Sequence, residues 1–177
     1  SSFSFAKRAA ACLLSLKGFE IADDNVHPDA HATILYAETR AWAIAEVEAG
    51  RNWTIHRPRP QIVGNTLILN FESLREDEYL FAHDPTKYGG RGIDSHLGFQ
   101  VTGATITTSQ VRGRQVALTC SAAPTGFRFA YQSQDVRGSG NRFSAHRNLL
   151  RTSLTRPSIL LPGQTLHRWI PSFKMAF

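Results

Sequence analysis

An acidic residue and a histidine stand three positions apart near the start of the chain, at Asp24 and His27. A carboxylate at this spacing can accept the imidazole N–H, which fixes the ring tautomer and leaves the other nitrogen free as a general base. Asp and His cooperate in this way in a hydrolytic triad, where a nucleophilic hydroxyl completes the set. The same spacing also suits an Asx turn that caps a following helix, so both interpretations are open at this point.

The neighbouring segments would hold this pair at the edge of a helix. Residues 5–16 have a helical composition, and residues 19–22 have a short β-like pattern. Pro28 restricts His27 to extended geometry and opens a second helix of about five turns, which ends before Gly50. The apolar positions expected on this helix are Ile34, Leu35, Ala37, Ala41, Trp42, Ile44, Ala45 and Val47.

After residue 50 the pattern changes to short alternating runs, separated by turns rich in Gly, Pro and Asn. The expected strands are residues 53–57, 66–71, 104–111, 115–121, 127–132 and 166–177. Short strands at this spacing favour an antiparallel sandwich or barrel. We therefore expect an α+β fold in two parts: a helix–strand–helix segment over residues 1–50, and an antiparallel β-sandwich domain over residues 51–177.

The composition excludes several classes of protein. The chain has 177 residues, of which 42% are hydrophobic, and this is enough for a core. Its two cysteines, Cys12 and Cys120, cannot form a disulfide scaffold or a four-thiolate zinc site. No apolar run approaches the ~20 residues that span a bilayer. The residues after the apolar run 9–16 do not form a small-residue cleavage site, so we expect neither a membrane span nor a signal peptide.

The charge is unevenly distributed along the chain. Residues 1–94 hold 13 acidic and 10 basic residues, whereas residues 95–177 hold a single acid, Asp135, and 10 basic residues. A basic half of this kind is either a solvated face or a surface for an anionic partner such as an acidic polysaccharide. We do not expect nucleic acid as the partner. The aromatic run 127–131 alternates as a buried sandwich face does and lacks the βαββαβ pattern of an RNA-binding domain.

Two further groups of polar residues have both an ordinary and a functional interpretation. One brackets a Gly-rich loop and could bind a divalent metal if the loop folded back; its members are His83, Asp84, Asp94 and His96. No ligand-spacing motif links them, so we expect surface groups and neither a metal nor any other cofactor. The other is a basic cluster, which is an exposed loop, a subunit contact or a site for a carboxylate-bearing sugar or phosphate; its members are Arg142, His146, Arg147 and Arg151.

Residues 24–44, DNVHPDAHATILYAETRAWAI, resemble the last conserved block of the SGNH (GDSL-type) hydrolases. The resemblance continues into the β region, where four segments are similar in order to the β-rich tail of the sialate O-acetylesterase-like branch. These segments are residues 64–71, 97–104, 113–118 and 127–131.

The resemblance implies that Asp24 and His27 complete a triad with a serine far upstream, together with upstream Gly and Asn donors to the oxyanion. No serine before Asp24 stands in a Gly-Asp-Ser-like turn; those present are Ser1, Ser2, Ser4 and Ser15. We therefore expect residues 1–50 to be the end of an SGNH hydrolase domain, with the nucleophile on a preceding segment of the same protein. The chain would be the C-terminal portion of a carbohydrate O-acetylesterase acting on an acetylated polysaccharide or glycan.

An alternative comes from the C-terminal part of the sequence. Residues 144–152 and 160–169 differ from the sugar esterases and resemble esterase-like proteins of bacteriophages. This resemblance implies a virion spike or tail-fibre protein that uses an esterase-derived fold for attachment to surface polysaccharide or for structure. Its partners would be virion neighbours or further copies of the chain. Either function implies a location outside the cell or on a virion surface.

Overall fold

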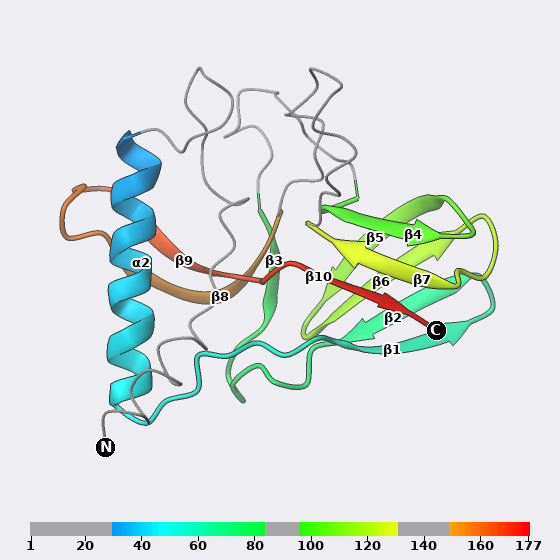
Figure 1. Cartoon of the computed structure of the whole chain (residues 1–177), viewed down its shortest axis with the longest axis horizontal. Helices are drawn as coiled ribbons and strands as arrows, with labels where there is room; N and C mark the ends of the chain where they lie inside the picture. The colour runs from blue at the N-terminus through cyan, green and yellow to red at the C-terminus, as the bar shows by residue number, and fades with distance from the viewer. Residues whose placement is uncertain (1–29, 84–95, 131–148) are drawn as a thin grey trace.

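A computed structural model gives the fold and describes residues 30–83, 96–130 and 149–177. These residues form one α-helix and ten strands, which pair in three antiparallel sheets (Figure 1). The expected antiparallel sheets with a helix are confirmed, so the fold is α+β or mainly β, while the expected end of an SGNH hydrolase domain over residues 1–50 stays a prediction. The predicted helix over residues 5–16 and the strand over residues 19–22 lie outside the described residues.

The helix α2 (Ala30–Glu48) is rich in Ala and Glu, which favour helix formation. It ends at Gly50, whose φ of 76° is a conformation that glycine adopts easily, and the Gly50 N–H donates to the Val47 carbonyl over 3.0 Å. The predicted second helix is confirmed from Ala30 onward. Within the described part of the chain, no helix has the length and apolar composition that crossing a bilayer requires.

The buried face of α2 differs from the expected one. Ala37, Ala41 and Ala45 are exposed, whereas the polar residues Thr39 and Glu46 are buried. The Thr39 hydroxyl donates to the backbone carbonyl four residues earlier over 2.7 Å, and arginines satisfy the Glu46 carboxylate. Polar side chains on this face are therefore buried without losing hydrogen bonds, which the apolar pattern alone did not indicate.

Ten strands make up the sheets, and every strand pair is antiparallel. One sheet has the order β1-β2-β6-β5, the second β10-β7-β4 and the third β3-β8-β9. The strands are β1 (Arg59–Val63), β2 (Thr66–Asn70), β3 (Leu80–Ala82), β4 (Phe99–Thr102), β5 (Ile106–Arg112), β6 (Gln115–Cys120), β7 (Gly126–Phe129), β8 (Leu150–Pro157), β9 (Thr165–Trp169) and β10 (Phe173–Ala176).

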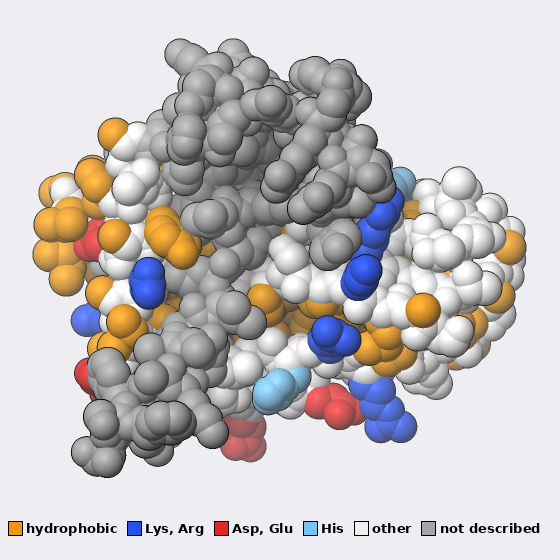
Figure 2. Space-filling view, in the orientation of Figure 1, with side chains coloured by type: hydrophobic (Ala, Val, Ile, Leu, Met, Phe, Trp, Pro, Cys, Tyr) orange, Lys and Arg blue, Asp and Glu red, His pale blue; other side chains and the backbone are white. Residues whose placement is uncertain are grey.

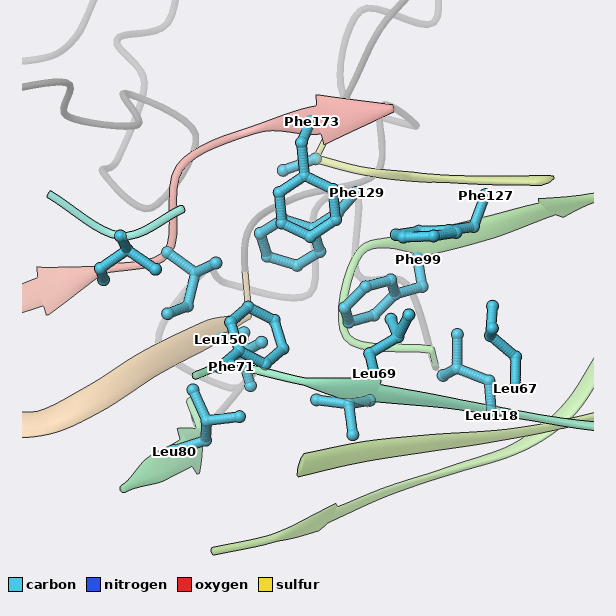
Figure 3. Close-up of a cluster of buried hydrophobic side chains, with 14 of the residues drawn as sticks. Leu67, Leu69, Phe71, Leu80, Phe99, Leu118, Phe127, Phe129, Leu150 and Phe173 are labelled. Atoms are coloured by element: carbon cyan, nitrogen blue, oxygen red, sulfur yellow. The ribbon is translucent and has the colours of Figure 1, made fainter. Parts of the chain in front are cut away.

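The first two sheets enclose the main apolar core, which Figure 3 shows in close-up. Alternation along β2 and β6 points every second side chain inward, and the register pairs Leu67 with Leu118 and Leu69 with Val116. The opposing sheet contributes aromatic rings, namely Phe99, Phe127, Phe129 and Phe173. The predicted strands over residues 66–71, 115–121 and 127–132 are confirmed, with ends shifted by one to three residues.

Two predicted strands were wrong in different ways. Residues 53–57 form no strand, and two of their backbone N–H groups, those of Thr54 and His56, bond to side chains instead of a neighbouring strand. The His56 N–H, for example, donates to the Ser73 hydroxyl over 2.9 Å. Residues 166–177 form two strands in different sheets, with a break at residues 170–172. Pro171 lies within that break, where a residue without an N–H interrupts a ladder.

The helix packs on the third sheet and closes a second, smaller core. The Trp42 ring meets the Trp53 ring edge-on at 4.9 Å, and Ala43 and Leu166 are buried beside them. In Figure 1, α2 stands at one end of the molecule and the sheet β3-β8-β9 lies between it and the other sheets. The boundary expected between residues 50 and 51 stays a prediction.

Three charged side chains join the C-terminal end of α2 to the chain that follows. The Glu46 carboxylate accepts hydrogen bonds from Arg51 Nε over 2.7 Å, Arg51 Nη2 over 2.8 Å and Arg75 Nη2 over 2.7 Å. The Arg51 hydrogen bond and then the Arg75 bond and charge lower the pKa of Glu46 from 4.5 to about 2, although desolvation opposes them.

This carboxylate predicts an acid-sensitive part of the stability. Because the folded-state pKa of Glu46 lies below its unfolded value, its contribution is fully present above about pH 4.5 and is lost as the pH falls towards 2. Glu46→Gln should lower the unfolding free energy by at most about 3 kcal/mol at pH 7. The difference in unfolding free energy between Glu46→Gln and the unmodified chain, measured by urea titration, should shrink steadily as the pH falls below 4.5. Glu48→Gln, an exposed change on the same helix, is the control. A difference that does not change with pH would contradict the prediction.

Candidate functional site

The predicted pair Asp24 and His27 lies outside the described residues, so its hydrogen bond stays a prediction. The structure does describe the helix that follows this pair and the surface on which the helix rests. Ala32, in the first turn of α2, is 3% exposed and packs on Trp169 of β9. Tyr36, one turn later, packs against the same two residues. The N-terminal end of α2 is therefore fixed in place against the third sheet.

Two imidazole rings meet Trp169 at this end of the helix. The ring centroids of His83 and Trp169 are 4.8 Å apart, and His167 lies 5.7 Å from His83 and 5.8 Å from Trp169. The backbone N–H of His83 donates to the Leu149 carbonyl over 2.7 Å, which fixes its position at the end of β3. Imidazole is the side chain best suited to exchanging protons near neutral pH. Two histidines, His83 and His167, therefore lie together near the N-terminal end of α2, the helix that follows His27 in the sequence.

Several described serines have structural roles. The Ser158 hydroxyl donates to the Glu38 carboxylate, and the Ser172 hydroxyl donates to the Ala130 carbonyl over 2.9 Å. The Ser153 hydroxyl accepts from the Tyr79 N–H over 3.1 Å. Among the described residues, none of these hydrogen bonds joins one of the three hydroxyls to an imidazole. These hydrogen bonds connect strands, loops and the helix, and none of them is the serine–histidine hydrogen bond of a triad.

A second contact fixes the middle of α2. The Glu38 carboxylate accepts hydrogen bonds from the Ser158 hydroxyl and from the N–H groups of Ile159 and Leu160, at 2.7 Å and 3.1 Å for the backbone donors. The Ser158 hydrogen bond is the largest cause that lowers the pKa of Glu38, with desolvation opposing it. The loop between β8 and β9 is therefore tied to the helix by one carboxylate.

The two groups of polar residues predicted from the sequence lie only partly within the described residues. Among the residues that the structure describes, no three His, Cys, Asp or Glu side chains gather in a way that could hold a metal ion. Asp84 and Asp94, which would be needed for the loop site predicted as an alternative, lie outside those residues. Of the predicted basic cluster, only Arg151 is described.

Much of the basic charge in the C-terminal half serves the fold. Arg168 is 1% exposed and pairs with Glu78, and Arg114 donates to the backbone carbonyls of Leu74 and Glu72. On the face shown in Figure 2, several Lys and Arg side chains follow one another in a row right of centre and others lie at the left, with Asp and Glu side chains at the lower and left edges. Of the described arginines in this half, Arg168 is therefore withdrawn from the surface.

Sequence reasoning singled out neither His167 nor Trp169, although a signal was present. Both stand in the alternating run 166–177, and residues two apart in a strand share a face. His83 was noted only as a surface group beside a loop, or as a metal ligand in the alternative interpretation. Its contact with Trp169 joins positions far apart in the sequence, which no local pattern reveals.

Among the proteins compared with this chain, one solved structure is similar to it. No family model matches the chain, and no curated protein matches it in sequence. A solved structure of a carbohydrate acetylesterase from Xanthomonas citri is similar, with a TM-score of 0.45 and 17% sequence identity. The match covers 84% of this chain and 28% of that protein, so the chain spans less than a third of its length.

Proposed function

We propose that this chain is the C-terminal portion of an SGNH-type carbohydrate O-acetylesterase that acts on a glycan outside the cell. His27 is the general base and Asp24 orients it, while an upstream part of the same protein supplies the nucleophilic serine and the oxyanion donors. The observation that carries the proposal is the helix that follows the Asp–x–x–His–Pro block. It is present from Ala30, and its first turn is packed against Trp169.

Rigid placement of this helix supports a catalytic interpretation of the block. His27 precedes Ala30 by three residues, and three residues of extended chain span at most about 10 Å. A triad needs an imidazole held in one orientation, because the reaction is much slower when the general base is misplaced. Contacts along α2, at Ala32 and at Glu38, supply a fixed support of this kind.

The chemistry follows from these roles. As the serine oxygen attacks the acetyl carbonyl, His27 takes the serine proton, and the Asp24 carboxylate stabilises the resulting imidazolium. The imidazolium then gives its proton to the sugar oxygen, which leaves as a hydroxyl. Water attacks the acetyl-serine with His27 again as the base, so that acetate is released and the serine regains its proton.

The test uses the protein with its upstream segment and measures acetate released from an O-acetylated polysaccharide. His27→Ala should lower kcat by on the order of 10⁴-fold or more, and Asp24→Asn should have a smaller effect because water partly replaces the orienting group. His31→Ala removes an exposed histidine from the same region and should leave the rate unchanged. These 177 residues alone should hydrolyse p-nitrophenyl acetate no faster than a surface histidine does.

Equal rates for His27→Ala and His31→Ala would contradict the proposal, as would a serine-directed probe that labels one residue within these 177. The upstream sequence is a further check, since it either holds a Gly-Asp-Ser-like block or does not. If it holds none, the alternative function of a virion spike or tail-fibre protein replaces the esterase.

A further inference from the structure

Two aromatic rings are exposed side by side at β3, an edge strand of the sheet β3-β8-β9, one directly before the strand and one within it. Tyr79 is 47% exposed and Phe81 is 39% exposed, while Leu80 between them is buried in the main core. The two ring centroids are 5.1 Å apart and the ring planes are inclined at 44°. Exposed aromatic residues adjoining one another in this way are a common feature of binding surfaces.

An arginine on the neighbouring strand extends this surface. Arg151 of β8 is the register partner of Phe81, and its guanidinium carbon lies 4.8 Å from the Phe81 ring centroid. Nη1 donates to the Thr152 carbonyl over 3.2 Å. Nε is buried and has no hydrogen-bond partner among the described residues. The guanidinium therefore lies against the Phe81 ring, and the hydrogen bond it makes among the described residues goes to a backbone carbonyl and not to an acid.

The charge of Arg151 is also unbalanced within the described residues. Desolvation lowers its pKa, which shows that its surroundings disfavour the cation. Arg168, Arg75 and Arg51 are each paired with a glutamate, whereas none of the described ion pairs includes Arg151. A partly desolvated guanidinium without a carboxylate partner is complementary to an anion brought by a ligand.

We propose that Tyr79, Phe81 and Arg151 form a binding platform for a carboxylate-bearing sugar unit of an acidic polysaccharide. The C–H face of a pyranose ring packs on the exposed aromatic rings, and its carboxylate accepts hydrogen bonds from the Arg151 guanidinium. The Tyr79 hydroxyl lies at the wet end of an exposed ring, where it can bond to a sugar hydroxyl. That the anion is a sugar rests on the proposed esterase function, whereas anion binding rests on the unpaired guanidinium alone.

A single-stranded nucleic acid would need more than this platform offers. Such ligands are held by stacking together with a row of cations that follows the phosphate backbone. Among the described residues, one guanidinium, that of Arg151, lies over the Phe81 ring beside Tyr79. One charge beside two rings fits one carboxylate per sugar unit better than a continuous chain of phosphates.

Binding to polygalacturonate, measured by affinity electrophoresis or calorimetry, tests the platform. The carboxyl-reduced form of the same polymer is the matched neutral ligand. The unmodified protein should bind the acidic polymer at least about tenfold more tightly than the neutral one. Phe81→Ala and Arg151→Gln should each weaken binding to the acidic polymer by about tenfold or more. The matched controls are Phe177→Ala and Arg59→Gln, which change an exposed ring and an exposed guanidinium elsewhere, and each should stay within about twofold.

Several results would overturn the proposal: equal binding of the two polymers, no binding of either polymer, or unchanged binding by both platform variants. Tighter binding of an oligothymidylate that Phe81→Ala and Arg151→Gln abolish would assign the platform to nucleic acid instead. Circular dichroism shows whether each variant is folded, and Tyr79→Phe, which keeps the ring, offers a milder change that should weaken binding if the hydroxyl contributes. Polygalacturonate carries no acetyl esters, so a failed esterase assay and a failed binding assay are distinct outcomes.

Discussion

Glu78→Ala should destabilise the fold by about 3–5 kcal/mol, because it leaves a buried guanidinium without its charge partner. Arg168 is 1% exposed and Glu78 is 3% exposed. Arg168 donates through Nη1 to the Glu78 carboxylate and through Nη2 to the Trp53 carbonyl, and its guanidinium carbon lies 5.2 Å from the Trp53 ring centroid. Burial lowers the pKa of Arg168, and the Glu78 charge and hydrogen bond oppose this by favouring the cation.

Urea unfolding of matched variants would measure this effect. Glu72→Ala removes the carboxylate of an exposed ion pair with Arg59, whose atoms are 3.5 Å apart, and should cost less than about 1 kcal/mol. The double variant Glu78→Leu with Arg168→Met should be less destabilised than Glu78→Ala, since it leaves no buried charge unpaired. A loss for Glu78→Ala as small as that for Glu72→Ala would contradict the assignment of a buried pair.

Phe129→Ala should cost about 3–5 kcal/mol through the cavity it leaves in the main core. Phe129 is fully buried on β7, and its ring centroid lies 4.6 Å from that of Phe99 and 5.2 Å from that of Phe173. Its strand is the middle one of the sheet β10-β7-β4, so neighbours on both sides restrict how far the site can collapse.

The same unfolding titration provides the control for this change. Phe177 is 50% exposed, and its ring centroid lies 5.7 Å from that of Phe127. Phe177→Ala should lower the unfolding free energy by about 1 kcal/mol or less. Phe129→Leu, which keeps much of the volume, should lie between the two alanine variants. If Phe129→Ala and Phe177→Ala unfold at the same urea concentration, the ring at position 129 does not hold the two sheets together.

Local pattern predicted the strands that alternate and the helix that follows the Asp–x–x–His block. Leu67 and Leu69, for example, have the period of two that a half-buried strand requires. The strand β1 was missed because it has little apolar alternation and contains Pro60, which occurs in strands mainly at edges. The short edge strand β3 was missed because three residues are too few to show a period.

The surroundings of the candidate site were less predictable than the strands. Some buried polar residues depend on partners that are distant in sequence, as Glu46, Glu78 and Arg168 do. Because charged residues are mostly exposed in proteins, their residue type alone predicts that they lie at the surface. Trp169 was not singled out from the sequence, yet α2 and two histidines pack against it. The pair Asp24 and His27 came from spacing and resemblance, and both its catalytic role and its geometry stay predictions.

The tie between Glu38 and the loop after β8 has a consequence for the order of folding. The hydrogen-bonded positions Glu38 and Ser158 are separated by 120 residues, and Arg168 reaches back 115 residues to the Trp53 carbonyl. Contacts of such high contact order form late, because a long loop must close before they stabilise anything. During synthesis, α2 is made before β8 and β9 and gains its docking surface only when residues as far as Trp169 have emerged. The segment before α2 therefore acquires its fixed support only after β9 has been made, which delays assembly of the proposed site until this sheet has formed.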